Sequence, residues 1–483
     1  MSIIMPFVHI FNTPEKYYVY DVNKNTILRI TENVYNALNK SLIHKQDFNI
    51  DELLDQQEKD SIKFLINEGF FSNTRVKEII HPENEMLEYY LESKLSMITL
   101  QVTQQCNLKC NYCPYSGSYI NRRHSNKRMK LETAMKGIDF LIDHSRNSKT
   151  INIGFYGGEP LIEFNLIKIC MEYATIKAEG KELSFSITTN ATLVDENIID
   201  TLIKYNVQLL ISLDGPKNVH DKNRKMAANN CGSFDKVTQT MELIKDRCPE
   251  FYKNNVRFNA VLDTSDDFSC TKDFFTNYEL VKESNLRSSE VSTGYRKEGI
   301  SYSENYTSKV YYEIFKLFLS KLNRLKKENT SRLVDGYYNN IARINSLIKP
   351  QKSLPAQAHH AGPCIPGAVR LFLNVDGNFY PCEKVSETSS VMRIGNVDTG
   401  FDIEKARRLL NIGKLTEDSC KNCWAIRFCT LCAMAADNID DLSAELKQSN
   451  CGRVRRNVEE RFKDYCLLSE FDKKIHNEAI SIL

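Results

Sequence analysis

The sequence predicts an α/β protein whose central domain is a partial (β/α)6 barrel of the TIM type. Residues 96–290 alternate between short apolar runs and longer helical patterns, which favours parallel strands joined by crossover helices. Polar and glycine-containing motifs follow the ends of several of these runs, where parallel barrels carry their chemistry. The apolar share of 42% over 483 residues is enough for large cores, and the length suggests roughly two to four domains.

Residues 1–80 form a separate small unit in this prediction. Short β-like runs come first, broken by Asn and Pro, and two helical patterns follow. Thr31 directly precedes the first helical pattern and is a suitable N-cap. Strands followed by helices are typical of a small α+β module such as a winged helix. The expected strands are 7–11, 17–21 and 26–30, and the expected helices are 32–40 and 56–67.

Residues 81–95 are expected to be a linker with one helical turn, and the barrel follows at 96–290. Its expected strands are 96–102, 151–156, 185–189, 207–213 and 256–262. Its expected helices are 131–145, 164–178, 195–205, 233–245 and 272–284. Helical patterns at 304–327 and 332–348 predict a helical bridge over 291–360. The last domain, 361–483, has short strands and turns, with a hairpin at Asp376-Gly377.

Charge and hydropathy exclude several classes of protein. Basic and acidic residues number 64 and 62, so the chain has no strong field for nucleic acid and we expect no such partner. No apolar run approaches the ~18 residues of a membrane span. The N-terminal stretch lacks a basic region and a cleavage site, so we expect a cytoplasmic protein. In that reducing compartment, 15 cysteines indicate metal binding rather than disulfides.

Cys106, Cys110 and Cys113 form a CxxxCxxC triad on the loop after the first barrel strand. A four-iron cluster usually takes four thiolates, so three on one loop leave one iron open, as a catalytic metal site requires. A zinc knuckle or a redox loop is the alternative. A zinc site needs a fourth nearby ligand, for which His124 is the only close candidate.

The triad, with Tyr112 before its third cysteine, resembles the signature of the radical S-adenosylmethionine (SAM) superfamily. The resemblance implies that the open iron binds SAM and that reductive cleavage yields a 5′-deoxyadenosyl radical, which takes a hydrogen atom from substrate. Positions at later strand ends resemble family motifs, beginning with the Gly-Gly-Glu-Pro run at 157–160. A simple turn is the alternative there, and a surface arginine is the alternative for Arg224. The resemblance assigns cofactor contacts to Tyr112, Gly157, Gly158, Glu159, Thr189, Asn190, Ser212, Asp214 and Arg224.

A second cysteine array lies in the last domain. Its members are Cys364, Cys382, Cys420, Cys423, Cys429, Cys432 and Cys451. The array resembles a SPASM domain, the twin-cluster extension of peptide-modifying radical enzymes, and two zinc ribbons are the alternative. The resemblance assigns one auxiliary [4Fe-4S] cluster to Cys364, Cys382 and Cys432, and another to Cys420, Cys423, Cys429 and Cys451.

The array departs from the usual SPASM pattern in two ways. Only two residues separate Cys429 from Cys432, and no cysteine lies shortly before Cys364. The first auxiliary cluster is then left with an open iron, which could bind a substrate thiolate. Cys466, or else His359 or His360, could fill that position instead.

The N-terminal unit resembles the recognition element that binds leader peptides by strand addition. A structural cap or a nucleic-acid-binding winged helix is the alternative, but residues 51–70 carry more acidic than basic side chains.

Taken together, the resemblances imply the cofactors and partners of the protein. We expect three [4Fe-4S] clusters, SAM, a precursor peptide with a leader, and a one-electron donor such as flavodoxin or ferredoxin.

The expected reaction is that of maturases of the sactipeptide and ranthipeptide type, which form a thioether from a Cys sulfur to a carbon in a ribosomally made peptide. Carbon–carbon crosslinking and formylglycine-type oxidation are alternatives, and a non-catalytic zinc scaffold is an alternative of another class. No carboxylate stands out as a general base.

Overall fold

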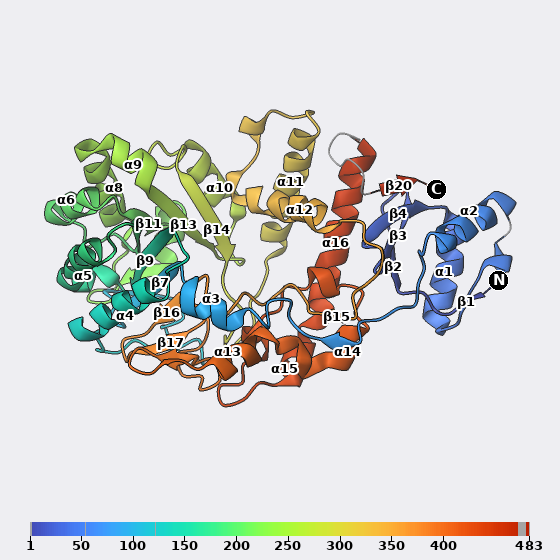
Figure 1. Ribbon diagram of the computed structural model, residues 1–483. Helices are drawn as coiled ribbons and strands as arrows, with labels where there is room; N and C mark the ends of the chain where they lie inside the picture. Colours follow the sequence, from blue (N-terminus) through green and yellow to red (C-terminus); the bar gives the residue numbers. More distant parts are fainter. Residues whose placement is uncertain (1, 54, 121, 472–479, 483) are drawn as a thin grey trace.

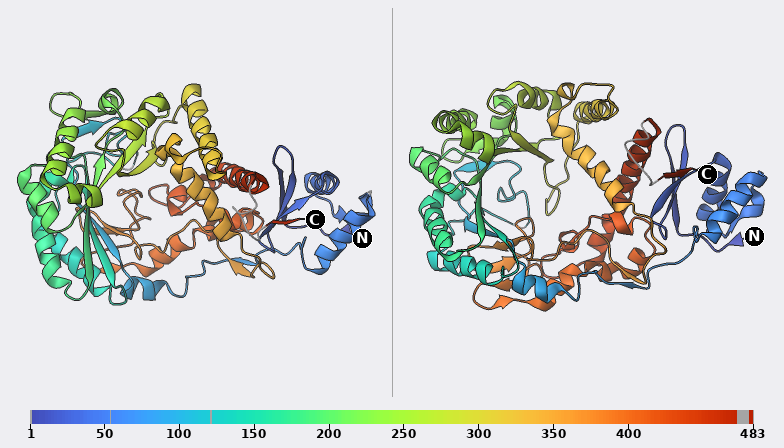
Figure 2. Two further views of the ribbon diagram at one scale, coloured as in Figure 1. Left: turned by 90° about the horizontal axis from the view of Figure 1, so that it is seen from above. Right: turned by 45° about the horizontal axis from the view of Figure 1, so that its top comes forward.

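The protein is described by a computed structural model that covers residues 2–53, 55–120, 122–471 and 480–482. The N-terminal unit lies at one end of an elongated molecule and the barrel strands at the other (Figures 1 and 2). The long helix α16 (Cys451–Phe471) stands between them. Within these residues, no helix is both long and apolar enough to cross a membrane.

The N-terminal unit contains the strands and helices that the sequence predicts. An antiparallel meander of β2 (Val8–Asn12), β3 (Tyr17–Asp21) and β4 (Thr26–Ile30) precedes α1 (Glu32–His44) and α2 (Gln56–Asn67). The expected cap is confirmed, because Thr31 Oγ1 accepts a hydrogen bond from Val34 N at 3.3 Å. Two-residue strands β1 (Ser2–Ile3) and β5 (Phe48–Asn49) pair with each other, and β5 contacts α1. A fourth strand, β20 (Ile480–Ile482), pairs in parallel with β4.

The meander has an apolar core on each face because side chains alternate along a strand. Val19 and Leu28 belong to the core formed with α1 and α2. Tyr20 and Ile27 belong to a second core, formed with Phe462 of α16. The N-terminal sheet is therefore packed against the C-terminal half of the chain on one face and covered by its own helices on the other.

The barrel consists of parallel strands in the order β7-β9-β10-β11-β13-β14, which confirms the predicted α/β class. The helices between them lie on the outer side of the sheet (Figure 2). The last strand was not indicated by its residue pattern, because NLRSSE has a single strongly apolar residue. The strands are β7 (Met97–Thr103), β9 (Thr150–Gly157), β10 (Glu182–Thr189), β11 (Gln208–Ser212), β13 (Val256–Leu262) and β14 (Asn285–Glu290). The helices are α4 (Leu131–Asp143), α5 (Phe164–Lys177), α6 (Glu196–Lys204), α7 (Lys217–Asn223), α8 (Phe234–Arg247), α9 (Pro249–Asn255) and α10 (Phe268–Asn277).

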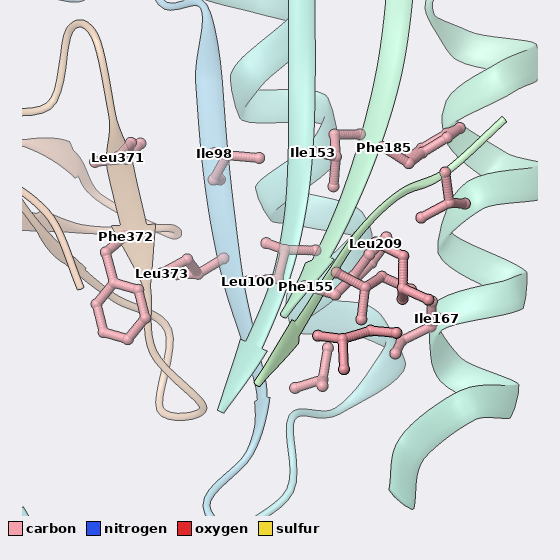
Figure 3. Close-up of a cluster of buried hydrophobic side chains, with 14 of the residues drawn as sticks. Ile98, Leu100, Ile153, Phe155, Ile167, Phe185, Leu209, Leu371, Phe372 and Leu373 are labelled. Atoms are coloured by element: carbon pink, nitrogen blue, oxygen red, sulfur yellow. The ribbon is translucent and has the colours of Figure 1, made fainter. Parts of the chain in front are cut away.

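The barrel sheet continues into the C-terminal region. Strand β16 (Leu371–Leu373) pairs in parallel with β7, so that Leu371 and Leu373 are buried with Ile98 and Leu100 (Figure 3). Strand β17 (Asn378–Tyr380) follows through the predicted hairpin, where Gly377 has φ +83°. The short strands β18 (Gly395–Asn396) and β19 (Gly400–Phe401) complete this edge.

The expected linker is part of the packed structure. Helix α3 (Leu87–Ser93) buries Leu87 and Leu91 fully in the barrel core. The helical bridge is present as α11 (Glu304–Lys321) and α12 (Asp335–Leu347). The remaining elements are β6 (Glu78–Ile79), β15 (Gln357–Ala358), α13 (Ile403–Leu410), α14 (Glu417–Lys421) and α15 (Ala444–Ser449).

Candidate active site

The three cysteines of the triad lie on a loop that is held at its middle by a short β-ladder. Strand β8 (Leu108–Cys110) pairs with β12 (Arg224–Met226), and the register sets Cys110 opposite Arg224. Leu108 N donates to Cys106 Sγ at 3.4 Å, and Cys113 N donates to the Cys110 carbonyl at 3.1 Å. Burial raises the pKa of all three thiols, that of Cys110 to about 12. Thiols in such a site lose their protons on binding a metal.

The two glycines at the end of β9 allow the chain to approach the start of this loop. Gly158 N donates to the Thr103 carbonyl at 3.0 Å, and Glu159 N donates to the Gln105 carbonyl at 2.8 Å. A Cβ at Gly157 would lie 2.1 Å from the Thr103 oxygen, and one at Gly158 would lie 2.1 Å from the Gln105 oxygen. Since neither distance is sterically possible, both positions need glycine.

Glu159 is fully buried and joins the ends of two strands. Its carboxylate accepts hydrogen bonds from Leu161 N at 3.1 Å, Thr189 Oγ1 at 2.6 Å and Asn190 N at 2.8 Å. Burial raises its pKa to about 7, and these hydrogen bonds oppose the rise. Both carboxylate oxygens are therefore engaged by the protein itself. The role visible in the structure is to hold the ends of β9 and β10 together.

Asp214 lies at the centre of a second buried group. Arg224 donates to it through Nε at 2.9 Å and Nη2 at 3.2 Å, and the Tyr112 hydroxyl also donates to it. Val261 N adds a bond of 3.1 Å from β13. Arg224 is 7% exposed, so its interpretation as a surface residue is wrong. Asp214 thus fixes the triad loop, through Tyr112, to β12 and β13.

Two further predicted residues lie at strand ends beside the triad loop. Asn190 Nδ2 donates to Asn107 Oδ1 at 2.9 Å, and Asn107 in turn donates to Thr192 Oγ1 at 2.8 Å. Ser212 ends β11 and is 9% exposed. The structure therefore brings the nine predicted cofactor positions to the strand ends around one loop.

The donor set fits an iron–sulfur cluster, because three thiolates on one loop can bind three irons and leave the fourth open. A single zinc ion needs ligands that converge on one point. Within the described ranges, no three His, Cys, Asp or Glu side chains do so, whereas the ligands of a cluster bind different irons. The His124 ring, the fourth ligand that a zinc site would need, has its Nδ1 atom 3.3 Å from the Gln104 carbonyl oxygen.

A cavity of about 410 Å³ lies beside the triad loop and is lined in part by Asn111, Tyr112 and Asp263.

The C-terminal cysteines separate into two groups in space. Cys364, Cys382 and Cys432 interact electrostatically with one another, and burial raises the pKa of Cys382 to about 11. Cys423 interacts instead with Cys420 and Cys451, and Cys429 interacts with Cys423 and Cys420; burial raises the pKa of Cys429 to about 11. Each of these interactions joins cysteines of one set that the resemblance assigns, and the assignment of the sets to two clusters stays a prediction.

The three alternative ligands for the first group have different surroundings. Cys466 is fully buried in the core that α16 shares with the N-terminal sheet, and it interacts with Glu470. His359 Nε2 accepts a hydrogen bond from Gly413 N at 2.8 Å. His360 is buried without a hydrogen bond to either ring nitrogen. Its titratable neighbours are His359, His81 and Lys447, and Lys447 Nζ lies 3.5 Å from Cys420 Sγ of the second group.

Sequence reasoning missed a buried polar network between the triad loop and the first C-terminal group. Arg122 Nε lies 2.8 Å from Glu387 Oε1, and Gln101 Nε2 contacts both oxygens of that carboxylate at 2.8 and 2.7 Å. Arg122 also donates to the carbonyl of Glu383, the residue after Cys382. No local pattern marks these residues, because the partners are 261–286 positions apart.

Comparison with known proteins identifies the central region. Residues 100–265 match the model of the radical SAM superfamily. The chain is 28% identical over 265 residues to the radical SAM cyclopropyl synthase TigE of Paramaledivibacter caminithermalis, covering 51% of this chain and 54% of that protein. It therefore spans about half the length of this relative. It is 25% identical over 370 residues to a cysteine-type anaerobic sulfatase-maturating enzyme of Clostridium perfringens, covering 73% of this chain and 92% of the enzyme.

The fold is also that of a solved structure. The structure described as native anSMEcpe with bound AdoMet superposes with a TM-score of 0.58 at 21% identity, covering 80% of this chain and all of that chain. A related complex contains a Kp18Cys peptide, with a TM-score of 0.56 over 80% of this chain and 99% of that one. The matched residues contain the cysteine triad and all nine predicted cofactor positions. Residues 100–265 are therefore a radical SAM domain, and that family implies SAM and a [4Fe-4S] cluster.

Proposed function

We propose that this enzyme installs a thioether crosslink, from a Cys sulfur to a carbon of another residue, in a ribosomally made precursor peptide. The observation that carries the proposal is the grouping of the C-terminal cysteines into a set of three and a set of four. A four-iron cluster held by three thiolates keeps one iron free for a substrate thiolate.

Cys106, Cys110 and Cys113 would hold the catalytic cluster, and the strand ends around them would hold SAM. When bound, the two together supply a 5′-deoxyadenosyl radical that removes a hydrogen atom from a substrate carbon. The protein's own contribution is to hold the loop in place. The Asp214–Arg224 pair does this through Tyr112, and Gly157 and Gly158 do it by close contact with the start of the loop.

Cys364, Cys382 and Cys432 would hold the first auxiliary cluster, and Cys420, Cys423, Cys429 and Cys451 the second, which gives three clusters in all. The reaction breaks one S–H and one C–H bond and forms one S–C bond. The hydrogen atom would leave with deoxyadenosine, the thiol proton would go to solvent or a base, and the remaining electron would need a one-electron acceptor, which an auxiliary cluster would supply. A one-electron donor such as flavodoxin or ferredoxin would restart the cycle.

Carbon–carbon bond formation is the second candidate, supported by the similarity to a cyclopropyl synthase. The similarity to sulfatase-maturating enzymes supports oxidation of a Cys or Ser side chain as a third. The reaction product has to decide between the three candidates.

The deciding experiment is anaerobic incubation with SAM, a reductant and Cys-containing precursor peptides, followed by alkylation and tandem mass spectrometry. A thioether gives a loss of two hydrogens per link and a Cys that resists alkylation. A carbon–carbon link gives the same mass loss with every Cys still alkylated. That second result would replace the thioether by the second candidate. The Cys106→Ala variant is the control, because it cannot complete the catalytic cluster.

A further inference from the structure

We propose that the buried ammonium group of Lys447 is the charge partner of the second group of C-terminal cysteines, and that it raises the reduction potential of the cluster that they would hold. The inference rests on the proposed function, because it takes Cys420, Cys423, Cys429 and Cys451 to be cluster ligands. It adds a positioning residue that is not itself a ligand, and a measurable property that this residue controls.

Lys447 lies within α15, and its side chain is buried in the protein. The residue is 1% exposed, which is rare for lysine because burial removes the water that solvates its charge. Its Nζ atom donates to Thr416 Oγ1 at 2.6 Å and lies 3.5 Å from Cys420 Sγ. Thr416 Oγ1 lies 3.3 Å from the same sulfur. The ammonium group therefore reaches a predicted cluster ligand both directly and through one hydroxyl group.

The protein supplies no carboxylate to balance this charge. Among the described residues, no Asp or Glu forms an ion pair with Lys447, and Glu417 of the neighbouring helix α14 pairs with Lys421 instead. His359 and His360 interact electrostatically with Lys447, but an imidazole ring has no negative charge to offer. A buried cation without a counter-charge is strongly destabilising. The position therefore requires an anion, and the thiolates of the second group are the groups that lie against it.

Buried cations also lie beside the other two cysteine groups, but each of them has a carboxylate partner. Arg224 lies beside the catalytic triad, with Nη1 4.0 Å from one of its sulfurs, and it pairs with Asp214 at 2.9 Å. Arg122 lies beside the first C-terminal group and pairs with Glu387 at 2.8 Å. In the described part of the chain, Lys447 is thus the buried cation that brings an uncompensated positive charge to a cysteine group.

The number of thiolates explains why the second group gains from this charge. A cluster held by four thiolates carries one more negative charge than a cluster held by three, and that charge disfavours the addition of an electron. The net charge around a cluster, the hydrogen bonds to its sulfurs and its exposure to solvent set its reduction potential. Charges interact strongly where water is excluded. Lys447 therefore offsets the additional thiolate and makes the four-thiolate cluster easier to reduce.

The consequence for the proposed reaction concerns the surplus electron. Formation of the S–C bond, with loss of a hydrogen atom and a proton, leaves one electron on the peptide. The peptide is oxidised by one electron as an auxiliary cluster is reduced by one, so the acceptor needs a sufficiently high potential. The charge of Lys447 favours the second group as the place where this electron is held.

The test is an EPR-monitored redox titration of the reconstituted full-length enzyme and of its Lys447→Met variant. The signal of the second group is identified as the one that is absent from the Cys423→Ala variant. We expect Lys447→Met to make one-electron reduction of this group about tenfold less favourable or more, which is a shift of about 59 mV to lower potential. The signals of the other two groups should keep their potentials.

Further substitutions separate the charge from the shape of the side chain. Lys447→Gln keeps a donor for Thr416 but has no charge, so it should shift the potential as Lys447→Met does. Lys447→Arg keeps the charge, and its reduction equilibrium should stay within about threefold of the wild type. Lys421→Met is the matched control, because Lys421 directly follows Cys420 but is 25% exposed and is paired with Glu417. It should leave the potential unchanged.

The outcomes divide as follows at position 447. An unshifted signal of the second group in both neutral variants would overturn the inference, and so would an equal shift in Lys421→Met. If the neutral variants lose the iron of the second group and Lys447→Arg keeps it, the group requires the charge and the inference holds. Loss of that iron in all three variants would mean that the shape of the lysine matters rather than its charge, and the inference would fall.

The same measurements separate this inference from the proposed function. If the wild-type enzyme has no EPR signal that Cys423→Ala removes, the second auxiliary cluster falls, and the inference falls with it. If the signal is present but does not respond to substitution of Lys447, the proposed function stands and the inference falls. If the signal shifts as expected but no peptide acquires a crosslink, the inference stands and the proposed reaction falls.

Discussion

The contact between Gly158 and the triad loop makes a prediction whose size follows from the structure. A Cβ at position 158 would lie 2.1 Å from the Gln105 carbonyl oxygen, 2.5 Å from its carbon and 3.0 Å from Cys106 N. All three are backbone atoms, so no side-chain rotation relieves the clash. Cβ atoms essentially never approach closer than 3.0 Å, so the Gly158→Ala substitution requires a displacement of at least 3.0 − 2.1 = 0.9 Å.

That displacement falls on the residue next to Cys106. A shift of about 1 Å in a reacting group can cost on the order of 100-fold in rate. We therefore expect Gly158→Ala to fold but to cleave SAM on the order of 100-fold more slowly. We also expect it to lose iron from the triad, because Cys106 is moved relative to Cys110 and Cys113.

The assay is the rate of deoxyadenosine formation under dithionite, with iron content and the EPR signal of the reduced cluster. Gly336→Ala is the matched control, since a Cβ there meets nothing within 4 Å and alanine is the better helix former. It should retain wild-type activity. A Gly158→Ala enzyme within threefold of wild type, with full iron, would refute the role assigned to this contact.

Three other substitutions probe the buried groups. Asp214→Asn leaves the Arg224 cation buried and unpaired, so urea unfolding should show a loss of about 3–5 kcal/mol; an equal loss for Asp398→Asn, in an exposed pair with Lys136, would contradict this. Glu159 has its pKa raised from 4.5 to about 7 by burial, so the folded chain binds more protons between those values. The free energy of unfolding of the protein should therefore fall as pH rises from 4.5 to 7, by up to about 3 kcal/mol. The Glu159→Gln variant should lack this pH dependence. Cys432→Ala should lower iron by the content of one auxiliary cluster while deoxyadenosine still forms; loss of deoxyadenosine formation as well would mean that the first group is not separate from the catalytic triad.

The sequence alone determined the chemistry-bearing positions and most of the elements. Local patterns were enough for the meander and helices of the N-terminal unit, for five of the barrel strands and for the hairpin at Gly377, because each depends on neighbouring residues. The cysteine triad could also be predicted from the sequence, because its three thiols lie close together on one loop. The sixth strand, β14, was missed because NLRSSE is mostly polar and takes its conformation from pairing with β13.

Only the tertiary structure decided how distant residues meet. It buried Arg224 against Asp214, which no local pattern distinguishes from a surface position. It placed the Glu159 carboxylate where it joins the ends of β9 and β10 by hydrogen bonds. It also brought Gln101, Arg122 and Glu387 into one buried network. It also laid residues 480–482 along β4, more than 450 positions away. Contacts between residues so far apart in the sequence form only when the whole chain folds. The spacing of residues along the sequence therefore does not predict them.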